Sequence, residues 1–205
     1  LERGLKGLGL RGWRLRARRV MKGVIGATKV DVLIGTGKKA VTEFDEGHGH
    51  AHRHDDVALT SILERLRKAK LPAVVRDRAV ATFLRLGDAE ARVHRTTLKG
   101  VHFHEVGAID SVVDITGGIL ALHLLGVERV TASPFPISHG HIHCRHGVLP
   151  VPGPATMEIV RGAPTVPLDV DGETLTPTGA ALIRTLAEEY GPPPAMTVEA
   201  VGYGA

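Results

Sequence analysis

The sequence predicts an α+β fold with a mixed sheet, an N-terminal β-hairpin and paired helices. Two stretches with strand character stand side by side near the start of the chain, at residues 12–20 and 24–34. Two stretches with apolar residues at helical spacing then follow one another, at 59–71 and 72–93. Because strands and helices come in groups rather than alternating, α+β is favoured over an alternating parallel fold. No repeat or linker divides the 205 residues, so we expect one domain.

The two N-terminal strands are predicted to form an antiparallel hairpin through a tight turn at residues 21–23. Trp13 and Leu15 alternate with basic residues, which is typical of a strand with one wet, arginine-bearing face. A basic segment such as 1–22 could also meet phosphate, but the strand interpretation needs no partner. Residues from about 36 to 56 lack periodicity and are rich in Gly, Lys, acids and His, which predicts a mobile loop.

A pair of helices is expected next, and Pro72 stands at the start of the second, where a first-turn proline is tolerated. Gly87 lies inside that helix and costs about 1 kcal/mol relative to alanine, so a break there is expected as one outcome.

In the second half we expect a short strand, a helix and an interrupted strand, at 101–107, 110–125 and 127–137. Gly126 should end the helix. Pro134 and Pro136 should make the following strand an edge strand or take it out of the sheet. The remaining elements are expected as an irregular segment, two helices and a last strand, at 138–154, 154–161, 178–190 and 196–201.

The composition excludes several functional classes. The aromatic residues are Phe 4, Trp 1 and Tyr 2, too few to build a stacking surface for single-stranded nucleic acid. The apolar stretch 119–122 is far shorter than the roughly 20 residues that span a bilayer. The single cysteine, Cys144, excludes an internal disulfide and indicates a reducing compartment, so we expect a cytoplasmic protein.

Histidine is the most unusual feature: 12 of the 205 residues are histidines, and they stand in clusters, which indicates metal chemistry. In the first cluster every second residue is a histidine, and an extended chain would place these side chains on one face about 7 Å apart. Its members are His48, His50, His52 and His54. We interpret this cluster as a metal-collecting or storage site, and the alternative is an unselective polar tract.

A second cluster, His102 and His104, is followed at once by Glu105. A short strand would present both imidazoles on one side and the carboxylate on the other, which predicts a more defined metal site. Asp110 and Asp114 then stand four apart and share one face of the predicted helix.

The same helix face continues through Gly117 and Gly118. Two adjacent glycines cost about 2 kcal/mol relative to alanine, so we expect a backbone or a ligand to approach this face closely. Asp110 is explained equally well as a helix N-cap. If that face is covered, Asp114 needs a cation or a polar partner.

A third cluster combines imidazole nitrogen and thiolate sulfur, and its members are His139, His141, His143, Cys144 and His146. Such mixed ligands suit nickel, copper or zinc, and the ligand types do not choose among these metals. His94 and His123 stand alone on predicted helices, where we interpret them as satisfied or exposed side chains.

Residues 176–181 open a helix with hydroxyls and small side chains. The free amides of its first turn and the positive end of the helix dipole are available to an anion such as phosphate. The alternative is that Thr176 or Thr178 only caps the helix. The sequence contains no phosphate-binding P-loop, dinucleotide fingerprint or nucleophile elbow.

Four segments carry a resemblance to one family: HFHEVGAIDSVVDITG at 102–117, HGVLPVPGPAT at 146–156, LTPTGAAL at 175–182 and AMTVEAVGYGA at 195–205. From about Gly12 onward the chain resembles the LarC family, the nickel insertion proteins for the nickel-pincer cofactor of lactate racemase. The resemblance implies a CTP-dependent nickel chelatase of the lyase class. Such an enzyme inserts Ni²⁺ into a pyridinium bisthiocarboxylate mononucleotide and hydrolyses CTP to CMP and diphosphate.

The resemblance also implies that residues 1–205 are the N-terminal domain of a longer protein and lack the family's first strand. CTP and its divalent cation are then expected in a C-terminal domain. The expected metal ligands are His102, His104, His146, Cys144 and the first cluster, His48, His50, His52 and His54. Glu105, Asp110 and Asp114 are the expected catalytic residues, and the substrate phosphate is expected at Thr176, Thr178 and Gly179.

Two other functions stay open. The chain could be a nickel-binding or storage module without catalysis of its own. It could also be a zinc-dependent hydrolase that uses Glu105 as a base beside bound water. The expected partners are the precursor mononucleotide and lactate racemase or other pincer enzymes, with no nucleic acid and no membrane. Self-association and the meeting of the histidine clusters in space are left open.

Overall fold

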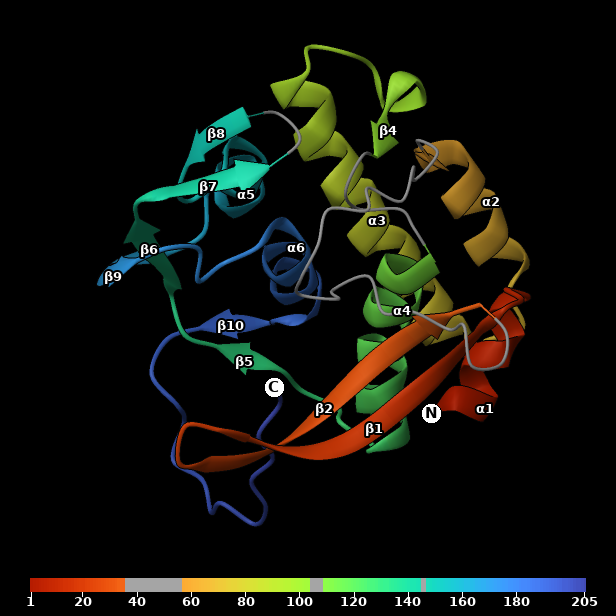
Figure 1. The fold of residues 1–205 in the computed structure, drawn as a ribbon, viewed down its shortest axis with the longest axis horizontal. Coiled ribbons are helices and arrows are strands. Elements are labelled where there is room, and N and C mark those ends of the chain that lie inside the picture. The colour runs from red at the N-terminus through yellow and green to blue at the C-terminus, as the bar shows by residue number, and fades with distance from the viewer. Residues whose placement is uncertain (36–56, 104–108, 145–146) are drawn as a thin grey trace.

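The computed structural model describes residues 1–35, 57–103, 109–144 and 147–205, and statements about the fold refer to these residues (Figure 1). Helices α2, α3, α4, α5 and α6 form the body of the molecule, and pairs of strands lie around them. The strands form five two-stranded sheets, three antiparallel and two parallel. The α+β class is therefore confirmed, with both kinds of pairing spread over separate small sheets.

The N-terminal hairpin is confirmed. Strand β1 (Trp13–Lys22) pairs antiparallel with β2 (Ile25–Ile34), in register from Trp13 opposite Ile34 to Lys22 opposite Ile25. The turn is shorter and later than predicted: Met21 and Lys22 stay paired, the loop is Gly23–Val24, and Gly23 takes the positive φ of 57° that a two-residue hairpin loop requires. Two short helices that the sequence analysis did not predict precede it, α1 (Glu2–Leu5) and the 3₁₀-helix η1 (Lys6–Leu8).

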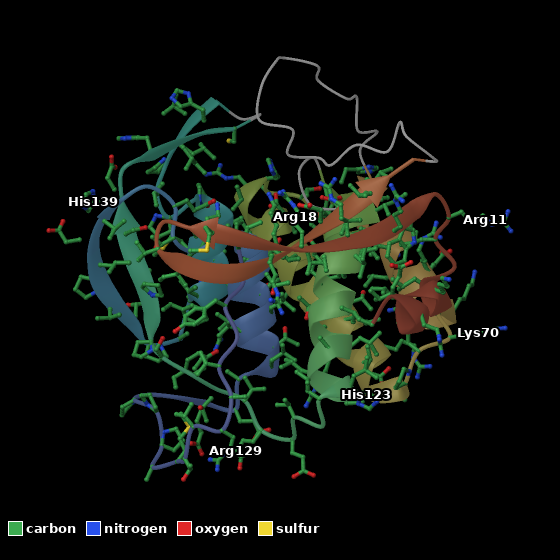
Figure 2. The ribbon with its side chains drawn as sticks, turned by 60° about the horizontal axis from the view of Figure 1, so that its bottom comes forward. Arg11, Arg18, Lys70, His123, Arg129 and His139 are labelled. Carbon is green, nitrogen blue, oxygen red and sulfur yellow. The ribbon has the colours of Figure 1, made fainter. Side chains whose placement is uncertain are left out.

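The basic face of β1 finds a partner within the hairpin. Arg16 and Arg18 donate hydrogen bonds to the Asp31 carboxylate on β2, at 2.9 and 3.3 Å. Lys29 lies 3.6 Å from the same carboxylate. The Asp31 side chain is only 6% exposed, so three cations surround one buried acid; Figure 2 shows Arg18 on the hairpin.

The helical pair is also confirmed, as α2 (Leu59–Lys68) and α3 (Ala73–Val93) with Pro72 as the N-cap of α3. The break expected at Gly87 does not occur. Gly87 is buried, and a Cβ atom on it would overlap the Cδ2 methyl group of Leu59. The glycine therefore lets α2 lie close against α3, which also packs against α4, α5 and α6.

Helix α4 (Ile109–Leu124) agrees with the prediction, and Gly126 follows it with a positive φ of 71°. Strand β5 (Thr131–Ala132) pairs in parallel with β10 (Glu189–Tyr190), whereas β6 (Phe135–His139) pairs in parallel with β9 (Thr165–Asp171). The chain thus passes from one sheet to another beside Pro134, as the two prolines predicted.

Several expectations for the second half are wrong. The segment expected to be irregular contains a hairpin of β7 (His141–Cys144) and β8 (Gly147–Pro150). Helix α5 (Pro154–Val160) is as expected, but α6 spans Pro177–Leu186 and ends before β10. Strand β9 was not predicted: Val166, Leu168 and Val170 occupy alternate positions there, but Pro167 interrupts the pattern. No strand is found among the described residues 196–201, and the tail instead makes one bridge, between Gly204 and Thr28.

Two further short elements are η3 (Leu98–Gly100) and the strand pair β3 (Val57–Ala58) and β4 (His102–Phe103). The core is aliphatic, with Phe83, Phe103 and Phe135 as its buried aromatic rings. In the described part of the chain, no helix combines the length and the apolar character that crossing a bilayer requires.

Candidate metal site

Asp110 and Asp114 lie in the first two turns of α4, whose opposite face enters the core through Val112, Val113, Ile115, Ile119 and Leu120. Because the helix begins at Ile109, Asp110 is its second residue and not its N-cap. Its carboxylate accepts hydrogen bonds from its own amide and from that of Ser111. The start of a helix, where amides are free, favours a negative charge at this position.

The two carboxylates repel each other and differ in exposure, because Asp110 is half-buried and Asp114 is exposed. Burial raises the pKa of Asp110, and the two amide hydrogen bonds lower it only in part. The Oδ1 atom of Asp110 is buried and has no hydrogen-bond partner among the described residues. Desolvation, together with the charge of Asp110, raises the pKa of Asp114 to about 6. A cation bound between the two groups would relieve both penalties.

The two glycines of α4 have different surroundings. Gly117 is buried, and a Cβ atom on it would lie 3.4 Å from Leu5 Cδ1 of α1. The close neighbour expected on this face is therefore the side chain of Leu5. Gly118 is exposed and a Cβ atom on it would have no neighbour within 4 Å. The space beside Gly118, one turn beyond Asp114, is open.

Strand β4 positions His102 with an exposed side chain. The next residue, Phe103, is buried against Phe83 of α3, with ring centroids 6.4 Å apart in a T-shaped arrangement. In the β3–β4 pair, Val57 stands opposite Phe103 and Ala58 opposite His102. Val57 directly follows residues 36–56, which contain the first histidine cluster, and Phe103 lies between His102 and His104 of the second. The β3–β4 pairing therefore brings Val57 and Phe103 side by side.

Several predicted site residues lie outside the described residues: His48, His50, His52, His54, His104, Glu105 and His146. Within the described ranges, no three His, Cys, Asp or Glu side chains are grouped closely enough to hold a metal ion. Of the predicted site residues that are described, Asp110 and Asp114 are the pair whose charges interact.

The third cluster is divided by its strand geometry. His141 and His143 are exposed on β7, and Cys144 is half-buried. Successive side chains of a strand point to opposite faces, so Cys144 does not share the face of His143. The Cys144 thiol donates to the Gly147 carbonyl at 3.5 Å, and His139 lies 3.0 Å from Asp169.

The isolated histidines agree with their prediction, because His94 lies 3.2 Å from Glu90 and His123 is exposed. Figure 2 shows His123 on α4 and His139 at the edge of β6, well apart from each other.

At the start of α6, Thr176 caps the helix, as the alternative interpretation predicted. Thr176 Oγ1 accepts a hydrogen bond from the Gly179 amide at 3.2 Å, and the Ala180 amide donates to the Thr176 carbonyl at 2.9 Å. Pro177 has no amide hydrogen. Of the first four helical amides, that of Thr178 is left for an anion.

Comparison with known proteins identifies the family. The nickel insertion protein family matches residues 1–205, eleven residues more at the N-terminus than the resemblance noted from the sequence motifs. The chain is 41% identical to the pyridinium-3,5-bisthiocarboxylic acid mononucleotide nickel insertion protein of Desulfitobacterium hafniense (strain DSM 10664 / DCB-2), over 100% of the chain and 47% of that protein.

It is 40% identical to the protein of the same name from Geobacillus kaustophilus (strain HTA426), and 42% identical to a putative nickel insertion protein of Myxococcus xanthus (strain DK1622). Each match covers 100% of the chain and 48% of the relative, so the chain spans about half the length of these relatives. No solved structure matches the chain. On the match over its full length and these identities, the chain belongs to the nickel insertion protein family.

Proposed function

We propose that the protein to which this chain belongs inserts Ni²⁺ into a pyridinium-3,5-bisthiocarboxylic acid mononucleotide, the precursor of a nickel-pincer cofactor. The family and the names of the relatives support this reaction. The structural observation that carries it is the Asp110–Asp114 pair, in which a buried, unpartnered carboxylate oxygen lies beside a second acid. The pair stands at the start of α4, directly after the segment that contains His104 and Glu105.

In this proposal the acids have two roles. As carboxylates they attract the incoming cation and help to hold it while it passes to the substrate. A metal ion displaces protons from its ligands as it binds, and a carboxyl group with a pKa near 6 is suited to accept a proton at neutral pH. Asp114 is that group once the cation has passed to the substrate, because its pKa in the absence of a cation is about 6.

The other predicted residues complete the proposal. His102, His104, His146 and Cys144 would supply nitrogen and sulfur ligands, with Glu105 as a third acid. The first cluster, His48 to His54, would collect nickel and pass it on. The substrate phosphate would meet the start of α6 through the free amide of Thr178, with Thr176 and Gly179 shaping the turn.

We further propose that residues 1–205 form one N-terminal domain and that the reaction depends on CTP, bound with a divalent cation elsewhere in the protein. The loaded cofactor would pass to lactate racemase or a related pincer enzyme in the cytoplasm.

The test is nickel insertion by the full-length protein to which this chain belongs, supplied with CTP and the precursor and scored by activation of apo lactate racemase. The double variant Asp110→Asn, Asp114→Asn should lose most of this activity. Asp77→Asn, which changes an exposed acid paired with Arg76, should keep it. Wild-type activity in the double variant would refute the role of these acids.

The histidine assignment has its own test in the same assay. The variant His102→Ala, His104→Ala should lose nickel delivery while it stays folded. His123→Ala, which changes an exposed histidine at the far end of α4, is the matched control. Turnover without CTP, with zinc bound as purified, would favour the hydrolase over the chelatase.

A further inference from the structure

Within the described part of the chain, three buried donors without hydrogen-bond partners lie on neighbouring elements other than α4. They are the Nε atom of Arg85 on α3, the Nε atom of Arg184 on α6 and the hydroxyl of Tyr190 on β10. Helices α3 and α6 pack against each other, and Figure 1 shows β10 next to α6, which it follows in the chain. A buried donor without an acceptor costs free energy, so three together require an explanation.

The two arginines interact, and the interaction is unfavourable. Burial lowers the pKa of Arg85, and the neighbouring positive charge of Arg184 lowers it further. The Tyr190 hydroxyl acts in the opposite direction on the same group, which places all three side chains within electrostatic reach. The Tyr190 ring packs on Phe135 with centroids 5.6 Å apart, which holds the hydroxyl in position.

The acids nearest to these residues in the sequence already have other partners. Asp88, one turn from Arg85, raises the pKa of Arg85 through its charge, but its ion pair is with Arg92 at 2.9 Å. Glu188 and Glu189, just before Tyr190, lie 4.0 and 2.5 Å from Arg129. Among the described residues, neither Arg85 nor Arg184 forms an ion pair with an acid at 4.0 Å or less.

We propose that Arg85, Arg184 and Tyr190 form a binding site for a phosphate-type oxyanion. Guanidinium groups bind phosphate through paired N–H donors, and the phenol would add a third donor. The anion would satisfy the three buried donors and cancel the repulsion between the arginines. Its source is either the phosphate monoester of a pyridinium nucleotide or free inorganic phosphate.

This site is separate from the start of α6, where the substrate phosphate was placed above. Arg184 stands eight residues beyond Thr176, which corresponds to about 12 Å along a helix. The inference therefore does not rest on the proposed nickel chemistry, but if the anion is the phosphate of a pyridinium nucleotide, this site replaces the start of α6 as the phosphate site.

The test is calorimetric titration of the full chain with inorganic phosphate at fixed ionic strength. Arg184→Gln should weaken phosphate binding roughly tenfold to 100-fold, because charged hydrogen bonds are lost. Arg76→Gln makes the same change in net charge at an arginine paired with Asp77, and should bind like the wild type. Equal binding in both variants, or no binding by the wild type, would overturn the proposal.

A second measurement separates a ligand site from a structural pair. Without phosphate, Arg184→Gln should unfold at the same temperature as the wild type or higher, because it removes a repulsion. A lower unfolding temperature with unchanged phosphate binding would mean that the arginine is structural. If Arg184→Gln does not fold, Tyr190→Phe keeps the ring contact with Phe135, removes one donor, and should still weaken binding several-fold.

The source of the anion follows from a third titration, with nicotinic acid mononucleotide as the probe. Binding tighter than that of inorganic phosphate, and weakened by Arg184→Gln, would assign the site to a nucleotide phosphate. Binding no tighter than that of inorganic phosphate would assign it to the free ion. Mononucleotide binding that Arg184→Gln leaves unchanged would exclude the nucleotide from this site.

Discussion

Gly87 and Leu59 share one space: the Cδ2 methyl group of Leu59 on α2 occupies the position next to Gly87 where any larger residue would place its Cβ atom. Leu59 is only 1% exposed, so its side chain is held by the core and has little freedom to move away. A glycine that lowers the helix propensity of α3 thus lies where α2 and α3 approach each other closely.

Gly87→Ala should lower the free energy of unfolding by about 1–3 kcal/mol, because the overlap with Leu59 outweighs the gain in helix propensity. Gly118→Ala is the matched control, since it changes a helical glycine with no neighbour within 4 Å of the new atom. It should raise the free energy of unfolding by about 0.5–1 kcal/mol. Denaturant unfolding of both variants checks the signs, and stabilisation by both would show that the α2–α3 contact is loose.

Asp114→Asn should stabilise the protein at pH 7 by roughly 1 kcal/mol, a value reduced because the side chain is partly hydrated. The folded protein holds the Asp114 proton up to a pKa of about 6, against an ordinary value of 3.8. The contribution of Asp114 to stability is therefore most favourable below pH 3.8, becomes less favourable as the pH rises to 6 and is then constant. The variant should lose this slope, whereas Asp77→Asn should keep it. An unchanged slope in Asp114→Asn would contradict the raised pKa.

Asp31→Asn should destabilise the protein by about 2 kcal/mol at pH 7, because it leaves Arg16, Arg18 and Lys29 around a neutral group. Burial raises the pKa of Asp31, but the hydrogen bonds from Arg16 and Arg18 and the nearby charges bring it below 3.8 overall.

The contribution of Asp31 is thus fully present above pH 3.8 and disappears as the pH falls through the lowered pKa. The free energies of unfolding of the variant and the wild type should become equal in acid. The control, Asp88→Asn, changes an acid that is 55% exposed in its pair with Arg92 and should cost less than about 0.5 kcal/mol. A difference at pH 7 no larger than in this control would disprove the role of Asp31.

Deletion of residues 48–54 should remove most of the bound nickel, measured by equilibrium dialysis, and leave one tightly bound ion. The tight ion should weaken as the pH falls through about 6, because protons compete for Asp114. Loss of all binding on deletion would favour the storage module over the chelatase. His123→Ala, at an exposed histidine, should change neither the number of ions nor the affinity of the tight one.

The parts of the fold that the sequence predicted are those with a local signal. The β1–β2 hairpin and helices α2, α3 and α4 have a regular apolar period, so their neighbours in the chain define them. Strand β10 pairs with β5 and β9 with β6, which are distant in the sequence, and no local pattern reports such partners.

The features of the candidate site likewise fall into those that a local sequence pattern predicts and those that depend on packing between distant segments. The shared face of Asp110 and Asp114 follows from their spacing along one helix. The pairing of Val57 with Phe103, and the approach of Arg85 to Arg184, depend on how separate elements pack and could not be predicted from either segment alone.

The bridge at Thr28 has a consequence for how the protein is made. The Thr28 amide donates to the Tyr203 carbonyl at 2.9 Å, and the Ala205 amide donates to the Thr28 carbonyl at 3.3 Å. On a ribosome the hairpin that contains Thr28 emerges early, but this partner arrives only after residues 29–202 have been synthesised. In refolding followed by pulsed hydrogen exchange, the Thr28 amide should gain protection after the neighbouring amides of the hairpin, because its acceptor, the Tyr203 carbonyl, lies far away in the sequence.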